Sequence, residues 1–130
     1  MKVLNLTQHN ATEDQEKAGV INLSDPNDKA KLGALLTFEE LPMRREINDR
    51  AKAIAQLAIQ QSEYPPKAAR FKFAMIGGAP YLMAPLEQAL KDIGITPLYA
   101  FSVRESIEQH NSDGSVSKNN VFRHLGFIEA

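Results

Sequence analysis

The sequence predicts a three-layer α/β domain with a mainly parallel central sheet and an antiparallel hairpin at its C-terminal end. Apolar runs alternate with capped helices as far as Phe101, which is the pattern of strand–helix–strand units. From Ser102 onward the apolar and polar residues alternate with period two, and Asp113-Gly114 is a strong hairpin turn signal. The hairpin is expected over residues 102–128. A chain of 130 residues is most simply one domain, residues 1–130.

The composition excludes several classes of partner and site. The chain has 15 Lys+Arg and 16 Asp+Glu, a net charge of -1, so no basic excess favours duplex nucleic acid or an anionic membrane. It has no cysteine, which excludes disulfides and thiolate metal sites and suits a cytoplasmic protein. No run approaches the ~20 apolar residues of a membrane helix. We therefore expect a cytoplasmic protein that does not bind membranes.

The first 23 residues are expected to form a compact strand–helix–strand unit. Residues 3–7 are rich in leucine and β-branched side chains, as strands are. Thr12 and Gln15 are spaced as a capping box at the start of a short helix. Gly19 is a natural residue to end that helix, and residues 20–23 form a second strand candidate.

Two helices are expected before the central strand. Pro26 suits the first position of a helix that Ser24 or Asp25 caps. Thr37-Phe38-Glu39-Glu40 repeats the capping-box spacing, which places Pro42 near the first turn of the next helix. That helix is amphipathic and should run to about Ser62, before Tyr64-Pro65-Pro66 ends it. Its apolar positions are Ile47, Ala51, Ile54, Ala55 and Ala58.

A strand that runs into two glycines and then a helix is the sharpest local signal. Residues 70–76 form the strand, Gly77-Gly78 the turn, and Pro80 suits the start of a helix that reaches Ile93 before Gly94. Such a backbone leaves a sheet edge tightly and points the first N–H groups of the helix at a cleft. Residues 98–101 form the next strand, a continuous apolar run.

The carboxyl ends of these strands predict a ligand site. If the strands near 3–7, 71–76 and 98–102 are parallel neighbours, their ends share one edge of the sheet, where ligands of open parallel sheets bind. Hydroxyls, backbone N–H donors, arginines and histidines gather there, a set that suits an anionic ligand such as a phosphate. The candidate ligand-binding residues are Thr7, Asn10, Gly77, Gly78, Ser102, Arg104, Arg123 and His124. His9 is the candidate general acid or base.

Each candidate also has a purely structural interpretation. His9 can cap the following helix, and Gly77-Gly78 can serve only a tight turn and close helix packing. Arg104 can be a solvated residue of an alternating strand, and the positions of Arg123 and His124 depend on the hairpin register.

The chain lacks the sequence signatures of several established enzyme classes. The chain has no dinucleotide fingerprint, no P-loop and no nucleophile elbow. Its three histidines do not have the spacing of a metal-binding helix. We therefore expect no metal and no cofactor.

Two loops and the tail resemble a known group of proteins. Leu4-Asn5-Leu6-Thr7-Gln8-His9-Asn10-Ala11-Thr12-Glu13-Asp14-Gln15 and Ile76-Gly77-Gly78-Ala79-Pro80-Tyr81-Leu82-Met83 resemble the two ligand loops of small phage- and CRISPR-associated proteins with a stand-alone Rossmann-like, nucleotide-sensing (CARF-type) fold. The tail, from Phe101 to Phe127, resembles that of phage and prophage proteins. The resemblance covers about a third of the chain in short pieces. That pattern often has a Lys or Arg soon after the glycines, and Tyr81-Leu82-Met83 has none, which puts cleavage in doubt more than binding.

The resemblance implies a homodimer that binds a cyclic oligonucleotide or a related nucleotide messenger and cleaves it slowly through the ligand's own 2′-hydroxyl. Such an enzyme is a metal-independent phosphodiesterase, similar to a ring nuclease, in phage or CRISPR defence. Two alternatives remain open at this point. One is a non-enzymatic phage or prophage accessory protein that binds a host protein. The other is a small hydrolase or transferase that acts on a nucleotide or sugar phosphate.

Overall fold

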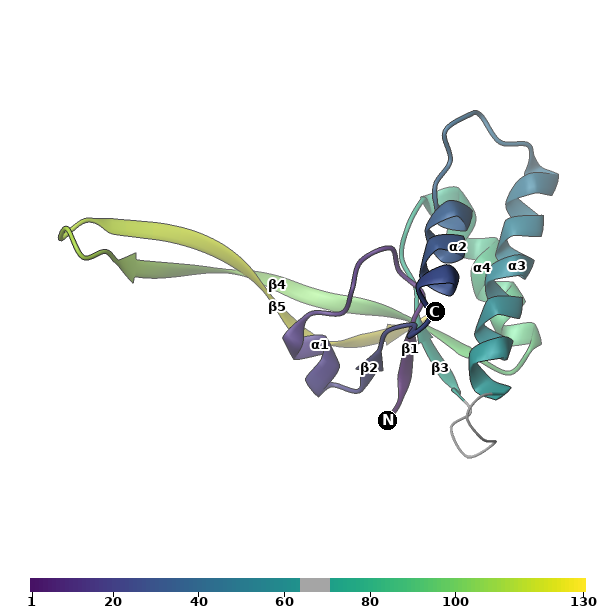
Figure 1. Cartoon of the computed structure of the whole chain (residues 1–130), viewed down its shortest axis with the longest axis horizontal. Coiled ribbons are helices and arrows are strands. Elements are labelled where there is room, and N and C mark those ends of the chain that lie inside the picture. The colour runs from purple at the N-terminus through teal and green to yellow at the C-terminus, as the bar shows by residue number, and fades with distance from the viewer. Residues whose placement is uncertain (64–70) are drawn as a thin grey trace.

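The computed structural model describes residues 1–63 and 71–130 and shows a mixed α/β chain built on one five-stranded sheet (Figure 1). The strand order is β2-β1-β3-β4-β5; the first four are parallel, and β5 is antiparallel to β4. The expectation of a mainly parallel sheet with a C-terminal antiparallel hairpin is confirmed. The strands are β1 Val3–Asn5, β2 Val20–Ile21, β3 Phe73–Met75, β4 Thr96–His110 and β5 Val116–Glu129.

Three helices cover one face of the sheet, and the shortest helix lies on the other side (Figure 1). Leu4 of β1 and Ala74 of β3 belong to a large apolar cluster with the three covering helices. Val3 and Met75, which point to the opposite face, join a smaller cluster with Leu98 of β4. This alternation is what period-two side-chain geometry requires of strands buried on both faces. The helices are α1 Glu13–Lys17, α2 Pro26–Leu36, α3 Arg44–Glu63 and α4 Pro80–Asp92.

The predicted caps of the first two helices are confirmed. The Thr12 hydroxyl accepts from the Gln15 N–H at 3.2 Å, and the Gln15 side chain accepts from the Thr12 N–H at 3.0 Å. Asp25 caps α2 by accepting from the Asn27 N–H at 2.8 Å. Gly19 follows α1 with a φ of 104°, a conformation that glycine adopts without strain.

The second predicted capping box, at Thr37-Phe38-Glu39-Glu40, is wrong. Thr37 is the C-cap of α2, and α3 begins only at Arg44, so Pro42 lies before the helix. The reason is that Thr37 is engaged elsewhere. Its hydroxyl donates to the Gly33 carbonyl at 2.8 Å and accepts from the Gln8 side chain at 2.8 Å.

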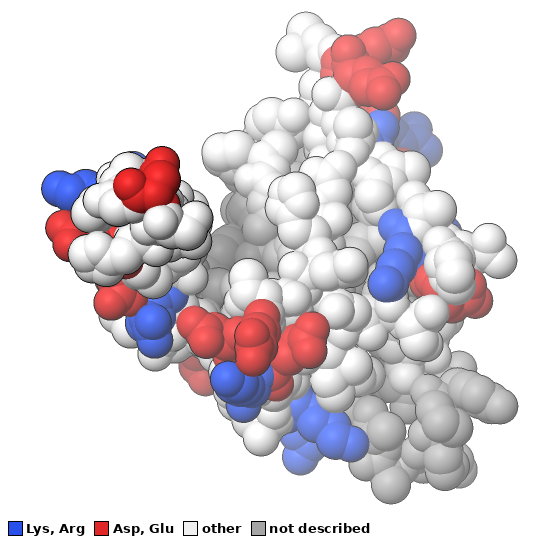
Figure 2. Space-filling view, turned by 60° about the vertical axis from the view of Figure 1, so that its left-hand side comes forward, with Lys and Arg blue, Asp and Glu red and all other residues white. Residues whose placement is uncertain are grey.

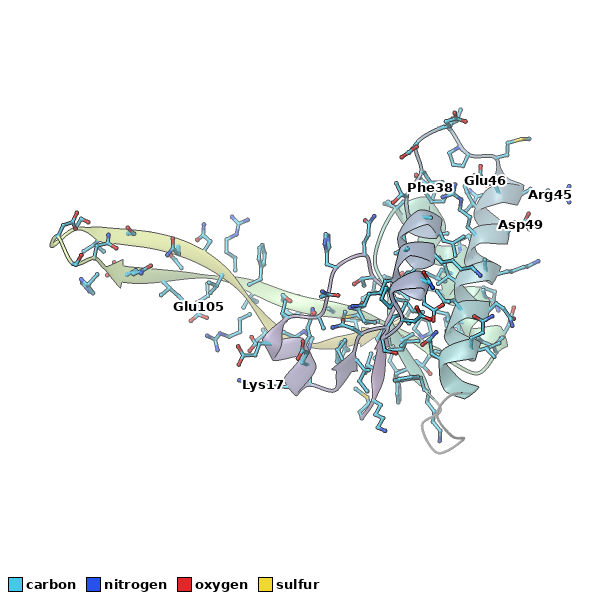
Figure 3. The ribbon with its side chains drawn as sticks, viewed as in Figure 1. Lys17, Phe38, Arg45, Glu46, Asp49 and Glu105 are labelled. Carbon is cyan, nitrogen blue, oxygen red and sulfur yellow. The ribbon has the colours of Figure 1, made fainter. Side chains whose placement is uncertain are left out.

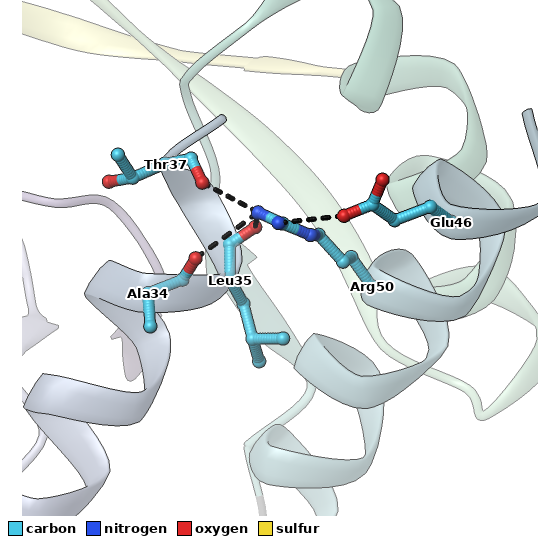
Figure 4. A network of polar contacts seen from close by, with 5 residues as sticks. All are labelled: Ala34, Leu35, Thr37, Glu46 and Arg50. Atoms are coloured by element: carbon cyan, nitrogen blue, oxygen red, sulfur yellow. Dashed lines mark hydrogen bonds and ion pairs between the residues drawn. The ribbon is translucent and has the colours of Figure 1, made fainter. Parts of the chain in front are cut away.

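Arg50 of α3 satisfies the carbonyl groups at the end of α2 (Figure 4). Its guanidinium donates to the carbonyls of Ala34 at 3.2 Å and Thr37 at 2.6 Å, and it pairs with Glu46 at 2.9 Å. It also lies 4.2 Å from the centre of the Phe38 ring. A cation at a helix C-terminus donates hydrogen bonds to carbonyl groups that have no partner within the helix, and its charge interacts favourably with the negative end of the helix dipole. This one side chain therefore fixes α2 against α3.

The long helices bury the faces that the sequence predicts. All five apolar positions expected along α3 are buried. Leu82, Leu86 and Leu90 of α4 are buried as well, and Gly94 follows that helix at a φ of 81°. The expected helix end at Tyr64-Pro65-Pro66 and the expected strand start at Arg70 fall outside the described residues. Across residues 1–63 and 71–130, no helix combines the length and the apolar character needed to cross a membrane.

The hairpin is a long two-stranded arm that leaves the sheet (Figure 1). The ladder of β4 with β3 ends at Leu98, whereas its ladder with β5 continues to His110. A register shift between Phe101 and Ser102 falls where the sequence changes from a continuous apolar run to alternation. The predicted turn is confirmed, because the Asp113 carboxylate accepts from the Ser115 N–H at 2.9 Å and Gly114 has a φ of 88°.

Candidate functional site

The ends of β1 and β3 lie side by side at the point where the strand order changes direction. From β1 the chain proceeds to β2 on one side and, after α2 and α3, to β3 on the other. The Leu6 N–H donates to the Met75 carbonyl at 2.9 Å. The γ-methyl of Thr7 lies 3.6 Å from where a Cβ on Gly77 would stand. Thr7 and Gly77, which are 70 positions apart, are therefore neighbours at the edge where open α/β sheets bind ligands.

A buried asparagine shapes the loop that follows β1. Asn5 is only 4% exposed, and its amide nitrogen donates to the His9 carbonyl and to the Asn22 side chain, both at 2.8 Å. Its amide oxygen accepts from the Thr7 N–H at 2.9 Å and from the Thr7 hydroxyl at 2.6 Å. The Asn22 oxygen also accepts from the Ala11 N–H at 2.9 Å. Both ends of the loop are thus tied to two asparagines, which hold its backbone in place.

A small cavity of about 60 Å³ lies between this loop and α2. Its volume equals that of about two water molecules, so it fits one small ligand group and not a whole nucleotide. Any larger ligand must lie across the open edge. Among the described residues that line the cavity, Lys29 is the one lysine or arginine. The lining is Asn5, Thr7, Gln8, His9, Asn10, Asn22, Leu23, Lys29, Leu32 and Gly33.

The Gly77-Gly78 turn leads directly into α4. Gly78 has a φ of 148°, which lies in the region that favours glycine. A Cβ there would lie 3.5 Å from the Met83 methyl group and 3.7 Å from a methyl group of Leu36. The N-cap of α4 is Ala79, which makes no side-chain capping hydrogen bond. The start of α4 therefore presents backbone N–H groups and the positive end of the helix dipole.

The four candidate residues of the hairpin find partners within the hairpin. Ser102 pairs with His124 in the ladder, and Arg104 pairs with Phe122, whose ring centre lies 5.6 Å from the guanidinium. The His124 ring packs on Phe127 with centres 4.7 Å apart. Its two nitrogens are buried without a hydrogen-bond partner in the described part of the chain.

Arg123 points to the opposite face of the hairpin from Arg104. It forms an ion pair with Glu105 at 2.7 Å, and this contact raises the pKa of the guanidinium above its ordinary value, with Asp14 of α1 contributing further. Figure 3 shows Glu105 on the side of the hairpin where α1 lies. Arg104, by alternation, faces away from α1. The two arginines therefore do not act on one ligand within a single copy of the hairpin.

The structure thus brings together one part of the predicted site. Thr7, His9 and Asn10 line the cavity, and Gly77 lies beside the Thr7 side chain. A common cleft that also includes Ser102 and Arg104 stays a prediction. Among residues 1–63 and 71–130, no group of three His, Asp or Glu side chains is placed to hold a metal ion.

A larger hollow lies away from this edge. It measures about 490 Å³ and is lined by residues of α3, with Leu35 of α2 and Met43. Figure 3 shows its Arg45, Glu46 and Asp49 at the start of α3, at the end of the molecule remote from the hairpin tip. The carboxyl ends of the strands do not contribute to its lining.

Sequence reasoning missed Asn5, Asn22 and Lys29. The two asparagines interrupt apolar strand segments, Leu4-Asn5-Leu6 and Val20-Ile21-Asn22-Leu23. Asn5 ends β1 and Asn22 directly follows β2. A polar residue within each of two short apolar runs is the signal that would have found the pair. Lys29 lies among the solvent-exposed positions of α2, so the sequence pattern does not distinguish it from them. It lines the cavity only because the loop that follows β1 packs beside α2.

No curated protein matches the chain, and no solved structure matches it either. A family model matches residues 1–128, which is nearly the whole sequence. The chain therefore belongs to the family described as the uncharacterized protein MJ1673 family.

Proposed function

We propose that this protein binds a cyclic oligonucleotide or a related nucleotide messenger at the β1/β3 edge and cleaves it slowly, in phage or CRISPR defence. The observation that carries the proposal is the contact of the Thr7–Asn10 loop with Gly77 between β1 and β3, where the order in which the chain adds strands to the sheet reverses. In Rossmann-like, doubly wound folds with the strand order 2-1-3-4-5, ligands bind at this switch point. We assign the fold to that class on the same strand order.

Backbone donors at the start of α4 are the proposed phosphate cradle. Pro80 has no N–H, and the Leu82 N–H already donates to the Ala79 carbonyl at 3.0 Å. The available donors are then the N–H groups of Gly78, Ala79 and Tyr81. Aligned N–H groups at a helix start favour an anion because the helix dipole adds to their hydrogen bonds.

Two cations are proposed to neutralise the ligand. Lys29 lines the cavity, so it serves the group bound beside the loop. Arg104 lies on the arm and serves a ligand that extends across the edge. A charge-assisted hydrogen bond from either contributes about 1.5–3 kcal/mol, which is roughly 10- to 150-fold in affinity.

The proposed cleavage uses the ligand's own 2′-hydroxyl. The 2′-oxygen attacks the adjacent phosphorus, the bond to the 5′-oxygen breaks, and the products are a 2′,3′-cyclic phosphate and a free 5′-hydroxyl. His9 either takes the proton from the 2′-hydroxyl or gives one to the leaving 5′-oxygen. His9 is one of the residues that line the cavity, and its carbonyl is fixed by Asn5. No metal is needed for this step.

Calorimetric titration with cyclic oligoribonucleotides tests the proposal. Lys29→Ala and Arg104→Ala are expected to weaken binding at least 10-fold, whereas His9→Ala is expected to abolish cleavage and retain binding. Lys31→Ala, an exposed lysine of the same helix, is the matched control and should bind as the wild type does. If the wild-type protein binds none of these ligands, the proposal fails. The non-enzymatic phage or prophage accessory protein then becomes the better interpretation.

A further inference from the structure

The β4–β5 arm has two free edges over most of its length. In the part of the chain that the structure describes, β4 pairs with β5 alone beyond Leu98, and β5 is the last strand of the sheet. A two-stranded ribbon in water is marginally stable by itself. Its unpaired N–H and C=O groups are also a template for pairing with another chain. Strands of 15 and 14 residues are long for a ribbon that, in the described part of the chain, pairs with no third strand beyond Leu98.

The arm also exposes most of the large apolar side chains found at the surface. Of the thirteen that are exposed in the described part of the chain, eight belong to β4 and β5. Phe122 is 66% exposed and Phe101 48% exposed, which is on the order of 100 Å² of aromatic surface each. The register divides these side chains between the two faces of the ribbon: Phe122 shares a face with Arg104, whereas Val103 and Val121 share the opposite face with Glu105. Exposed apolar side chains that gather on one element are typical of a protein–protein contact. The eight are Phe101, Val103, Ile107, Val116, Val121, Phe122, Leu125 and Ile128.

The charges of the arm are balanced. Residues 102–124 contain three basic residues, Arg104, Lys118 and Arg123, and three acidic residues, Glu105, Glu108 and Asp113. Figure 2 shows both signs on the projecting arm. Phosphate backbones and anionic membranes require a basic excess, so this surface does not favour either of them. A surface with equal numbers of both signs is complementary to a copy of itself.

We propose that the partner of the arm is a second copy of this chain, with the two arms in contact across a two-fold axis. A two-fold contact uses the same patch on both copies, which suits a surface that is apolar and balanced in charge. A standard interface involves about 20–30 residues a side, and the two strands together supply that number. The proposal deepens the homodimer that the resemblance implies, but it does not depend on any nucleotide.

The test is the mass of the full chain in solution, measured by light scattering after size exclusion. We expect twice the chain mass of 14.4 kDa for the wild type. Phe122→Asp should raise the dimer dissociation constant at least 10-fold. Leu41→Asp is the matched control, because Leu41 is 97% exposed but lies outside the arm, and it should remain a dimer. A wild-type monomer, or a dimer that Phe122→Asp leaves intact, overturns the proposal.

Hydrogen exchange of the wild-type protein provides a second measurement that needs no variant. Peptides from β5 should exchange more slowly at high protein concentration than at low concentration, whereas peptides from α3 should not change. Exchange in β5 that is independent of concentration overturns the proposal. So does purification of the chain as one copy with a different protein or a nucleic acid on the arm. Neither measurement uses a nucleotide, so failure of the dimer proposal can be distinguished from failure of the proposed nucleotide binding, which the calorimetric titration tests.

Discussion

Asn5 organises the predicted ligand loop, and its removal is expected to destabilise the whole protein. In Asn5→Ala the Thr7 N–H and the His9 carbonyl each lose a partner that they now have at 2.9 Å and 2.8 Å. The His9 carbonyl keeps the Thr7 hydroxyl as a donor at 3.1 Å, so the Thr7 N–H is the group left without its partner. An unsatisfied buried group costs about 1–3 kcal/mol, and urea denaturation should show a loss of about that size in the free energy of unfolding. Asn10→Ala, an exposed residue of the same loop, is the control. A loss below about 0.5 kcal/mol, the usual size of surface effects, would contradict the assigned role.

The second asparagine extends this prediction to a coupled pair. Asn5 donates to Asn22 at 2.8 Å, and Asn22 in turn fixes the Ala11 N–H. Groups in one hydrogen-bond network are not additive. The double variant Asn5→Ala/Asn22→Ala should therefore lose less free energy of unfolding than the two single losses combined. Additive losses would mean that the two side chains act independently.

Protonated Tyr99 is expected to contribute to the stability of the folded protein, and this contribution is lost at alkaline pH. Burial, together with the hydrogen bond that its hydroxyl donates to Glu87 at 2.5 Å, raises the pKa of Tyr99 well above its ordinary value of 10.0. Because the folded state favours the protonated phenol, its contribution is fully present below pH 10 and is lost as the pH rises beyond that value. Tyr99→Phe should flatten the fall in stability above pH 10, and Glu87→Gln should reduce it. An unchanged slope in Tyr99→Phe would contradict this origin.

At the scale of elements, alanine substitutions at two glycines distinguish the cost of backbone strain from the cost of a steric clash. Gly19 and Gly94 have φ angles of 104° and 81°, so alanine is strained at both, by about 1–3 kcal/mol. At Gly19 a Cβ would also stand 1.9 Å from the Met1 carbonyl oxygen, whereas at Gly94 it meets nothing within 4 Å. The strand cannot move away cheaply, because the Gly19 carbonyl accepts from the Val3 N–H at 2.9 Å.

Gly19→Ala is therefore expected to lower the melting temperature clearly more than Gly94→Ala does. Calorimetric melting of the two variants under one condition makes this comparison. An equal decrease in melting temperature for the two variants would show that the start of β1 moves to accommodate the added methyl group, and that backbone strain alone causes the destabilisation.

Elements that depend on neighbours in sequence were predictable, and those that depend on distant contacts were not. Thr12 and Gln15 lie three positions apart and cap α1 as their spacing predicts. Thr37 and Glu40 have the same spacing, but the Gln8 side chain and Arg50 of α3 attach Thr37 to the end of α2. Local spacing cannot show which of two helix ends a threonine serves, because, besides the Gly33 carbonyl four positions before it, the partners of Thr37 are 29 and 13 positions away.

The same limit applies to the site at the scale of the whole molecule. The juxtaposition of Thr7 and Gly77 follows from parallel pairing of β1 with β3, which apolar runs and capped helices predict. The positions of Arg104 and Arg123 depend on how the arm leaves the sheet. That path depends on a register shift beside Ser102 and on contacts of β5 with α1. The change of sequence pattern at Ser102 marks where the shift occurs, but it does not give the direction in which the arm then runs. Polar residues at the ends of strands were therefore easier to place than polar residues along the arm.

If two copies share the arm, the melting temperature must depend on protein concentration. Association stabilises the folded state by mass action, so a tenfold rise in concentration adds about 1.4 kcal/mol per dimer. For a dimer of this size that corresponds to a rise of roughly 2–3 °C in the melting temperature. The Phe122→Asp variant should melt at a lower temperature than the wild type at each concentration, because its arms associate at least 10-fold more weakly, and the Leu41→Asp control should melt as the wild type does. A wild-type melting temperature that is constant across a hundredfold range would mean that the exposed side chains of the arm contribute nothing to association, and that the arm folds on the two strands alone.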